Sequence, residues 1–464
     1  MALTVELAKR IAAFSHDDMT DEARHWARVG LIDYTGVTLA GATEPSGRIV
    51  TAVVDGADQP GPSLIFGTDK RTTPLNAAII NGTASHAQDF DDCNNTIGGH
   101  PSAPILPALI ALAEKTGASG RDTMAAYVLG FEVETAIARG VHFHHYEKGW
   151  HPTATMGVFG STAACAKLLG VDEETTATAF AIAVSLASGV KANFGTMTKP
   201  LHVGHCSRNG LFAVMMAKEG FTANHGAFEH SQGFFEVFNG AGTYHPEKIF
   251  ETWCDPLDIV EPAIAVKQYP CCGSTHPPVD AMINLVEREG LTPEMVKRID
   301  TMSHPRRLKH TDRADPQSPL DAKFSVQYCL ARALMHGKVV LPHFDDTAYL
   351  DKDAREVMKR VHVSPHPDMP ASGDNHLGAE VRVELMDGRV LSERVAQARG
   401  RGAADPLPMD KLKAKFESCA GLVLPADRVA ALYAKIEGFE ALKTVREYTA
   451  SAEVLAGKAT AAAE

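Results

Sequence analysis

The sequence predicts a mainly α protein, in which both chain ends form one large all-helical domain and the middle forms a smaller α+β domain. The chain has 464 residues. A single hydrophobic core stops growing at roughly 250–300 residues, so two domains are expected. Apolar residues recur at helical spacing through most of residues 1–264 and 404–464, whereas residues 265–403 mix helical patterns with alternation typical of strands.

The N-terminal part is expected to consist of helices with few strands. Residues 4–42 are expected to form two helices, and SLIFG, residues 63–67, is the one expected buried strand. A helix of small residues follows at 74–86, and an apolar helix begins after His100. The second of the first two helices has an apolar face formed by Ala23, Trp26, Ala27, Gly30, Leu31, Tyr34 and Val37.

The middle segment has its own sequence of elements. A helix is predicted over 276–289, a strand over 296–304 and an amphipathic helix over 321–339. Residues 379–395 alternate around Asp387–Gly388, which is a strong signal for a β-hairpin. This change of pattern places the inserted α+β domain at 265–403.

Composition excludes several classes of function. A net charge of −12 argues against non-specific binding to nucleic acid and against binding to an anionic membrane surface. No apolar run is long enough to span a membrane. The eight cysteines lack CxxC spacing and the N-terminus lacks the apolar core of a signal peptide, so a reducing cytoplasm is expected.

The stretch from residue 81 to 102 carries the densest group of catalytic residue types. His86, Asp89, Asp91, Asp92 and His100 lie within fifteen residues of one another. Carboxylates beside imidazoles suit general acid–base catalysis near neutral pH. The alternative is a solvated acidic loop that follows a helix.

A histidine-rich segment follows near residue 150. His142, His144 and His145 do not have the spacing of a helical zinc site, so no metal is expected. His151 precedes Pro152 at a predicted helix N-terminus, where anions are favoured. The alternative for His151 is a simple capping residue.

Two lysines are candidate anchors for a carboxylate. Lys199 precedes Pro200, which predicts an extended or turn conformation, and His202 lies close by in the sequence. Lys267 lies near Tyr269 in an apolar setting at the domain boundary. The alternative for each is an ordinary surface lysine.

Motifs for common cofactors are missing from the sequence. It contains no Walker loop, no GxGxxG after a strand, no HExxH and no GxSxG. The neighbouring Cys271 and Cys272 do not occur with the pattern of a cysteine protease. Asp, His and Lys therefore remain, and these residues suit proton abstraction beside a carboxylate without a cofactor.

These motifs resemble the MmgE/PrpD family. HAQDFDD, GHPS, GWHPTATMGVFGSTAAC, TKPLHVGH, KQYPCCGSTH and DAKFSVQYCLA occur in the family's order and cover nearly the full chain. The family includes 2-methylcitrate dehydratase, cis-aconitate decarboxylase and iminodisuccinate epimerase. The resemblance implies a helical domain with a smaller α+β lid domain, a homodimer, and a cofactor-free site for a small anionic carboxylate.

The resemblance also implies roles for particular residues. Similarity to cis-aconitate decarboxylase points to Asp89, His100, His151, Lys199 and Lys267 as catalytic positions. The expected substrate contacts are Cys93, which stands where the decarboxylase has a threonine, together with His202 and Tyr269.

The expected functions follow in order of preference. The first is a hydro-lyase acting on a 2-methylcitrate-like polycarboxylate, with His100 oriented by Asp89 to move protons. The alternatives are a cis-aconitate-type decarboxylase or an epimerase or racemase of an anionic substrate such as iminodisuccinate. A non-catalytic carboxylate-binding protein comes last.

Overall fold

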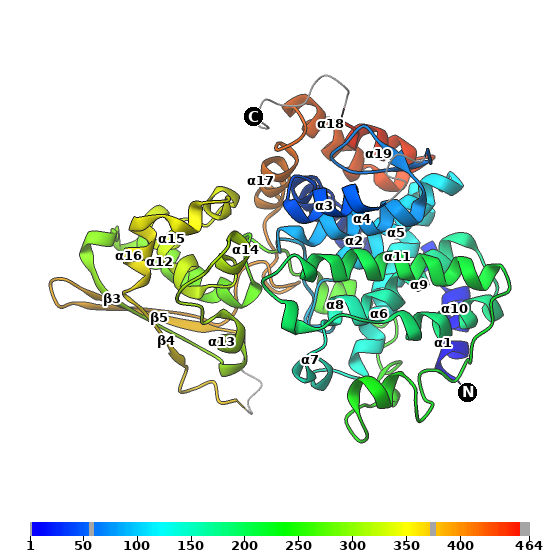
Figure 1. Cartoon of the computed structure of the whole chain (residues 1–464), viewed down its shortest axis with the longest axis horizontal. Helices are drawn as coiled ribbons and strands as arrows, with labels where there is room; N and C mark the ends of the chain where they lie inside the picture. The colour runs from blue at the N-terminus through cyan, green and yellow to red at the C-terminus, as the bar shows by residue number, and fades with distance from the viewer. Residues whose placement is uncertain (1, 55–59, 372–376, 455–464) are drawn as a thin grey trace. The chain divides into compact units, whose positions relative to one another are not determined.

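The computed structural model describes residues 2–54, 60–371 and 377–454. The chain forms two compact units. The larger unit comprises Met1–Val266, Gly402–Ala404 and Pro408–Glu464, and the smaller unit comprises Lys267–Arg401 and Asp405–Leu407. The prediction of a mainly α protein is confirmed (Figure 1). None of the described helices is long and apolar enough to cross a membrane.

Helices account for nearly all regular structure of the larger unit. The expected strand at 63–67 is reduced to β1 (Ser63–Leu64), which pairs with β2 (Arg71–Thr72). The helices of this unit, with short 3-10 and π turns left aside, are α1 (Leu3–Ala13), α2 (Asp21–Ala42), α3 (Pro45–Val53), α4 (Pro74–Ala87), α5 (Ser102–Thr116), α6 (Gly120–Arg139), α7 (His144–Lys148), α8 (Pro152–Thr155), α9 (Gly157–Leu169), α10 (Glu173–Leu186), α11 (Thr198–Lys218), α17 (Met409–Ala420), α18 (Ala426–Glu437) and α19 (Arg446–Ala452).

Local sequence signals explain where several of these helices begin and end. Thr73 caps α4 by accepting the N–H of Asn76, and Ser119 caps α6 by accepting the N–H of Asp122 at 3.1 Å. Gly117 ends α5 in a left-handed conformation. The C-terminal α17 packs on α2, since a Cβ added to Gly36 would lie 3.3 Å from Phe416.

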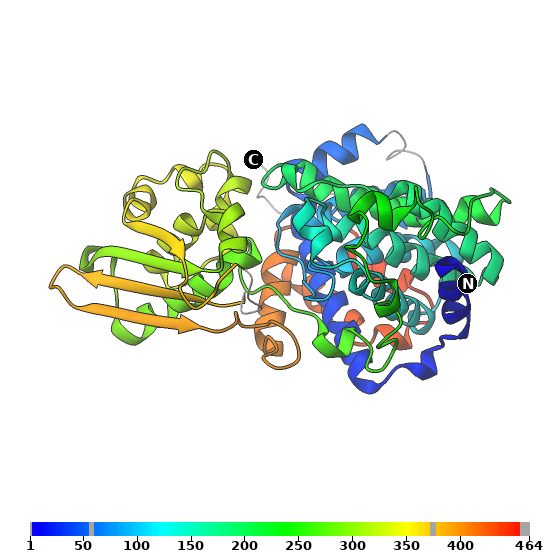
Figure 2. The same cartoon turned by 90° about the horizontal axis from the view of Figure 1, so that it is seen from below.

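The smaller unit is built on a four-stranded sheet of order β4-β3-β5-β6 (Figure 2). Its strands are β3 (Val296–Ser303), β4 (Val361–Pro365), β5 (Ala379–Leu385) and β6 (Val390–Val395). The predicted hairpin is confirmed, with β5 and β6 antiparallel and Gly388 at φ 88° in the turn. Strand β4, which runs parallel to β3, was not predicted.

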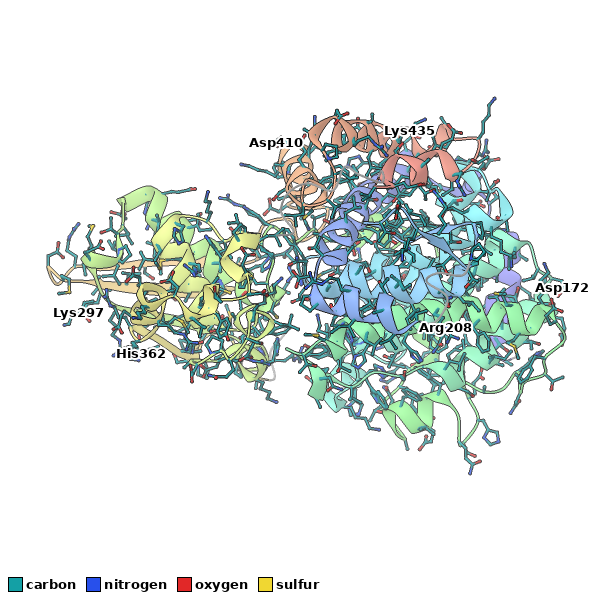
Figure 3. The ribbon with its side chains drawn as sticks, turned by 45° about the horizontal axis from the view of Figure 1, so that its top comes forward. Asp172, Arg208, Lys297, His362, Asp410 and Lys435 are labelled. Carbon is teal, nitrogen blue, oxygen red and sulfur yellow. The ribbon has the colours of Figure 1, made fainter. Side chains whose placement is uncertain are left out.

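The helices of this unit are α12 (His276–Glu289), α13 (Pro305–Thr311), α14 (Pro319–Ala322), α15 (Val326–His336) and α16 (Lys352–Met358). Of these, α12 packs against β5 and β6, and α15 packs against β4. The predicted bounds of α12 are confirmed, and Val381, Val383 and Leu385 of β5 are buried in the same apolar core as this helix. Charged side chains such as Lys297 of β3 are exposed (Figure 3).

One predicted helix is divided in two. The sequence pattern indicates a continuous helix over 321–339, but α14 ends at Ala322 and α15 begins at Val326. Ser325 explains the new start, because its hydroxyl accepts the N–H of Tyr328 at 3.1 Å and caps α15. The helix therefore restarts after the capping residue Ser325, although the apolar residues continue at helical spacing through this point.

Candidate active site

The site of the larger unit depends on a close crossing of α4 and α11. A Cβ added to Gly82 of α4 would lie 2.7 Å from the Cα of Gly204, and one added to Gly204 would lie 2.2 Å from the carbonyl oxygen of Ile79. The two helix backbones therefore touch. Asp89 follows the C-terminal end of α4 and Lys199 lies in the first turn of α11, so this crossing brings the two side chains together.

Asp89 and Lys199 form a buried ion pair. The Lys199 Nζ lies 2.6 Å from Asp89 Oδ1, and the two side chains are 5% and 3% exposed, respectively. Asp89 adopts φ 49°, a left-handed conformation that costs energy for a residue with a side chain. Such strain persists where the surrounding structure imposes it, which makes Asp89 a candidate functional position.

The predicted extended conformation of Lys199 is wrong. Lys199 is the second residue of α11, and Pro200 is the third. Proline is tolerated in the first helical turn because the N–H groups there have no partner within the helix. The alternative of an ordinary surface lysine is wrong, because Lys199 is buried.

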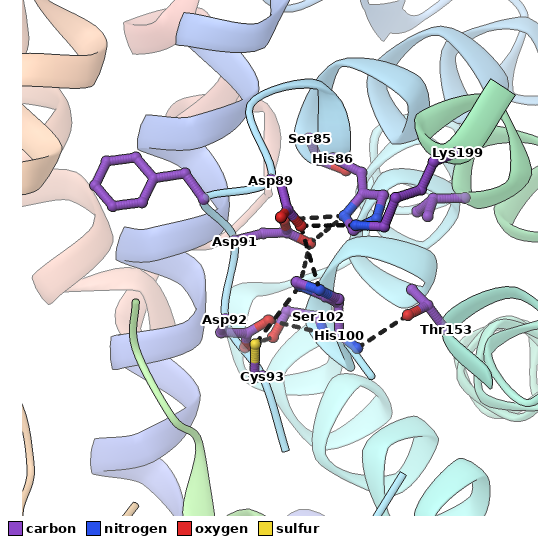
Figure 4. A network of polar contacts seen from close by, with 12 residues as sticks. Ser85, His86, Asp89, Asp91, Asp92, Cys93, His100, Ser102, Thr153 and Lys199 are labelled. Atoms are coloured by element: carbon purple, nitrogen blue, oxygen red, sulfur yellow. Dashed lines mark hydrogen bonds and ion pairs between the residues drawn. The ribbon is translucent and has the colours of Figure 1, made fainter. Parts of the chain in front are cut away.

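The Asp91 carboxylate bridges two imidazoles (Figure 4). It lies 2.8 Å from His86 Nδ1 and 3.1 Å from His100 Nδ1. Asp89, which the sequence analysis assigned to orient His100, lies farther away, at 3.7 Å from His100 Nε2. The rings of His86 and His100 meet edge to face at 4.5 Å between centroids.

Burial and neighbouring charges set the protonation of this cluster. Burial alone would raise the pKa of Asp91, but the imidazoles of His100 and His86 hold it well below the usual value, so Asp91 is ionised. Burial lowers the pKa of His86 to about 3, so its ring is neutral. An ionised carboxylate only accepts hydrogen bonds, hence Nδ1 of His86 carries the proton and Nε2 has a lone pair.

Asp92 has the opposite electrostatic character. Burial, reinforced by the Asp33 carboxylate, raises the pKa of Asp92 well above its usual value, so this carboxyl group is protonated. It bonds to the hydroxyl of Ser102, which also lies 2.5 Å from the Tyr127 hydroxyl. Asp91 and Asp92 are neighbours in the chain, yet only Asp91 provides charge to the imidazoles.

His151 and His202 lie close to each other beside the cluster. The two Nδ1 atoms are 3.2 Å apart, and the His151 ring stacks on His86 at 5.6 Å between centroids. Burial lowers the pKa of His202 to about 4 and that of His151 well below its usual value. Both rings are therefore neutral. His151 occupies the N-cap position of α8, and its side chain makes no capping hydrogen bond.

Cys93 lies next to His100. Its Sγ lies 3.8 Å from His100 Nδ1, and its backbone pairs with Ala265 through N–H to O distances of 2.8 and 2.7 Å. Asn94 closes the following turn, because its side-chain oxygen accepts the N–H groups of Thr96 and Ile97. The loop that follows Cys93 is thus fixed by its own hydrogen bonds.

The remaining predicted site residues, Lys267 and Tyr269, belong to the smaller unit. Both are buried. The Tyr269 hydroxyl donates to Asp280 at 2.6 Å, and burial together with the Asp280 charge raises its pKa. Tyr269 is therefore engaged within its own unit.

One group of side chains could hold a divalent cation. His86, Asp89, Asp91 and His100 each place a possible ligand atom within 4.8 Å of the others, among the residues that the structure describes. The Lys199 ammonium already binds Asp89, and its charge opposes a second cation there. His145, from the histidine-rich segment, instead bonds to Asn239 and Thr155 at 2.9 and 2.8 Å.

Asp91 and His86 lie in the predicted catalytic stretch, residues 81–102, but no role in the site was predicted for them. The available signal was the spacing of His86 and Asp91, five residues apart across a helix end. That spacing could not show which of three nearby aspartates reaches the imidazoles, because the left-handed turn at Asp89 decides the direction of the chain.

Comparison with known proteins identifies relatives over nearly the whole chain. Residues 5–247 match the MmgE/PrpD N-terminal domain and residues 269–437 match the MmgE/PrpD C-terminal domain. Cis-aconitate decarboxylase of Mus musculus is 30% identical to this chain, and the match covers 95% of this chain and 91% of the relative. Cis-aconitate decarboxylase of Homo sapiens is 29% identical, and the match covers 95% of this chain and 92% of the relative. The 2-methylcitrate dehydratase of Salmonella typhimurium is 23% identical, and the match covers 83% of this chain and 84% of the relative. The predictions of this family and of a lyase are confirmed.

Proposed function

Because this chain belongs to the MmgE/PrpD family, we propose that it is a carboxy-lyase that removes CO₂ from cis-aconitate or a closely similar unsaturated tricarboxylate. The observation that carries this proposal is the order of similarity among the relatives. The mouse and human decarboxylases match 95% of this chain at 30% and 29% identity, whereas the Salmonella dehydratase matches 83% at 23%. The comparisons thus favour decarboxylation over the dehydration that the sequence analysis placed first.

The geometry of the larger unit is consistent with decarboxylation and supports this proposal. The bond to one carboxylate breaks, CO₂ leaves, and the electron pair stays on the carbon skeleton until a proton is added. His100 is the proton donor in this proposal, because its side chain is 11% exposed while those of His86, Asp89 and Asp91 are 0–3% exposed. It is the member of the cluster that a substrate can reach.

The neighbouring groups take supporting roles. Asp91 holds the His100 ring through Nδ1, which leaves Nε2 for proton transfer. The Lys199 ammonium binds a substrate carboxylate and stabilises the negative charge that develops when CO₂ leaves. His151 and His202, which are neutral, donate hydrogen bonds at the edge of the site.

The proposal also includes assembly, location and cofactor use. The enzyme is expected to be a cytoplasmic homodimer that needs no cofactor. Dialysis of the purified protein against a strong chelator should leave its activity unchanged, and light scattering should give twice the mass of the 464-residue chain. Loss of activity that added divalent ions restore would instead assign a metal to His86, Asp89, Asp91 and His100.

The decisive experiment compares two substrates by mass spectrometry. Purified protein is incubated with cis-aconitate and, separately, with 2-methylcitrate. We expect CO₂ release from the first, strong impairment in His100→Gln and Lys199→Ala, and near-normal rates in His144→Gln, which changes an exposed histidine. Water loss from 2-methylcitrate without CO₂ release would assign a dehydratase. Deuterium uptake from solvent without either loss would assign an epimerase.

A further inference from the structure

His86 is the buried histidine of the cluster that the proposed mechanism leaves without a role. Its side chain is 0% exposed, whereas that of His100 is 11% exposed, so a substrate reaches His100 and not His86. The Nε2 atom of His86 has no hydrogen-bond partner among the residues that the structure describes. A buried nitrogen without a partner is unfavourable, so the ring needs a compensating contact elsewhere.

The other ring nitrogen of His86 supplies that contact. Nδ1 lies 2.9 Å from Asp91 Oδ1 and 2.8 Å from Asp91 Oδ2, so both oxygens of one carboxylate share its proton (Figure 4). Burial lowers the pKa of the ring to about 3, against the attraction of Asp91, so the donor is a neutral imidazole. The same carboxylate lies 3.1 Å from His100 Nδ1. His86 and His100 are therefore linked through a single acceptor.

The position of His86 is set by a rigid part of the larger unit. His86 lies in the last turn of α4, about one helical turn after Gly82, where α4 touches α11 through its backbone. Asp91 instead lies in the loop that follows this helix. A donor on the helix that binds both oxygens restricts the rotation of the carboxylate on the loop. The bond therefore transfers the fixed geometry of the helix to the partner of His100.

The ring of His86 also packs against two other imidazoles. It meets His100 edge to face at 4.5 Å between centroids and stacks on His151 at 5.6 Å. Another aromatic side chain of similar size would keep these contacts, whereas the bond to Asp91 needs an N–H donor. The two contributions can therefore be separated by substitution.

We propose that His86 is a positioning residue that acts on His100 through Asp91. Its Nδ1–H fixes the carboxylate, and the carboxylate fixes the tautomer and the orientation of the His100 ring. His86 itself neither gives nor takes a proton during turnover. This inference rests on the proposed function, in which His100 delivers the proton that replaces CO₂.

Three substitutions of His86 separate the donor from the ring. His86→Asn keeps an N–H donor as many bonds from Cβ as Nδ1 is, and loses the ring. His86→Phe keeps a ring and loses the donor, and His86→Gln places the donor one bond farther out. We expect kcat within about tenfold of wild type in His86→Asn, and a loss of roughly 10²-fold in His86→Phe and His86→Gln.

The same kinetics distinguish a positioning role from a substrate contact. Because the buried His86 ring does not touch substrate, KM should change by less than about threefold in each variant. His144→Asn is the control, because it makes the same change at an exposed histidine and should keep the wild-type kcat. The reverse pattern, with His86→Phe near wild type and His86→Asn inactive, would overturn the proposal, because ring packing would then be the role of His86.

A double variant tests whether His86 acts through Asp91. If it does, adding His86→Phe to Asp91→Asn should reduce kcat by less than about threefold further, because the carboxylate that His86 holds is already gone. Multiplied losses of the two substitutions would contradict this role. Circular dichroism checks folding. Should His86→Phe fail to fold, His86→Gln replaces it in the double variant, and the comparison of His86→Gln with His86→Asn carries the test.

Failure of the proposed function is distinguished by the choice of substrate. The kinetics are measured on cis-aconitate or 2-methylcitrate, whichever the wild type converts, so a dehydratase would overturn the proposed function and still test His86. If the wild type converts neither, crystal structures of His86→Asn and His86→Gln decide. The Asp91 carboxylate and the His100 ring should keep their places in His86→Asn and move in His86→Gln. Unmoved side chains in both variants would refute the positioning role.

Discussion

The Asp91 carboxylate lies 3.1 Å from Nδ1 of His100 and holds that ring in place. The same carboxylate lies 2.8 Å from His86, so one buried negative charge orients two imidazoles. This arrangement is common where a histidine transfers protons, because a fixed tautomer leaves the other ring nitrogen available.

Replacing Asp91 by asparagine should therefore remove most activity while the fold is kept. An uncharged amide cannot accept from both rings as the carboxylate does, so the tautomer of His100 is no longer fixed. We expect kcat to fall by roughly 10²–10⁴-fold, the usual contribution of general acid–base catalysis. Asp92→Asn is the control, because Asp92 is already protonated and its substitution removes no charge. Equal losses in the two variants, measured by CO₂ release, would contradict the role of Asp91.

Much of the fold could be predicted from the sequence, and the failures have identifiable causes. Helix α12 was predicted from the helical spacing of its apolar residues, and the hairpin at Gly388 was predicted from the residues of its turn. Both signals lie within the element itself. Strand β4 was missed because its residues are mostly solvent-facing, so apolar alternation is weak there. Lys199 was misplaced because Pro200 is compatible with both an extended chain and a first helical turn.

The candidate site was harder to predict than the fold. His100, Asp89 and Lys199 were identified through the family resemblance, and the structure places them together. The separate roles of Asp91 and Asp92 could not be predicted, since each depends on tertiary neighbours that have no sequence signal.

Removing Lys199 should destabilise the protein as well as inactivate it. Lys199→Met leaves the Asp89 carboxylate buried without its ion-pair partner, which typically costs about 3–5 kcal/mol in the free energy of unfolding. The double variant Asp89→Asn/Lys199→Met should recover part of this loss, because the uncompensated charge is gone. Urea unfolding of the wild type, Asp89→Asn, Lys199→Met and the double variant gives the coupling energy between the two side chains. Additive effects of the two substitutions would show that the pair is not coupled.

Lys415 should support the same loop from outside the cluster. Its Nζ lies 2.6 Å from Asp33 Oδ1 and donates to the carbonyl oxygen of Phe90, next to Asp89, at 2.6 Å. Lys415→Met should lower the free energy of unfolding by about 3–5 kcal/mol, since Asp33 loses its partner, and should reduce kcat by displacing the loop. Lys413→Met, which changes an exposed lysine on the same helix, should alter stability by less than about 0.5 kcal/mol.

Acid should destabilise the fold partly through His145. Burial lowers the pKa of this ring to about 4, so it stays neutral in the folded protein while an unfolded chain is protonated below about 6.5. The unfolded state then binds more protons, and stability decreases as the pH falls from about 6.5 toward 4, by up to about 1.4 kcal/mol per pH unit. His145→Gln should reduce this slope in chemical denaturation series run between mildly acidic and neutral pH. An unchanged slope would exclude His145 as a contributor.

The backbone contact between Gly82 and Gly204 makes the spacing of the proposed catalytic pair depend on how α4 packs against α11. Any side chain at either position would push α4 and α11 apart and would separate Asp89 from Lys199 at the same time. Substitutions elsewhere in the core can change packing and leave this spacing intact. We therefore expect substitutions that change substrate preference to occur in the surrounding loops. The distance between Asp89 and Lys199 should stay constant, because the crossing of α4 and α11 sets it.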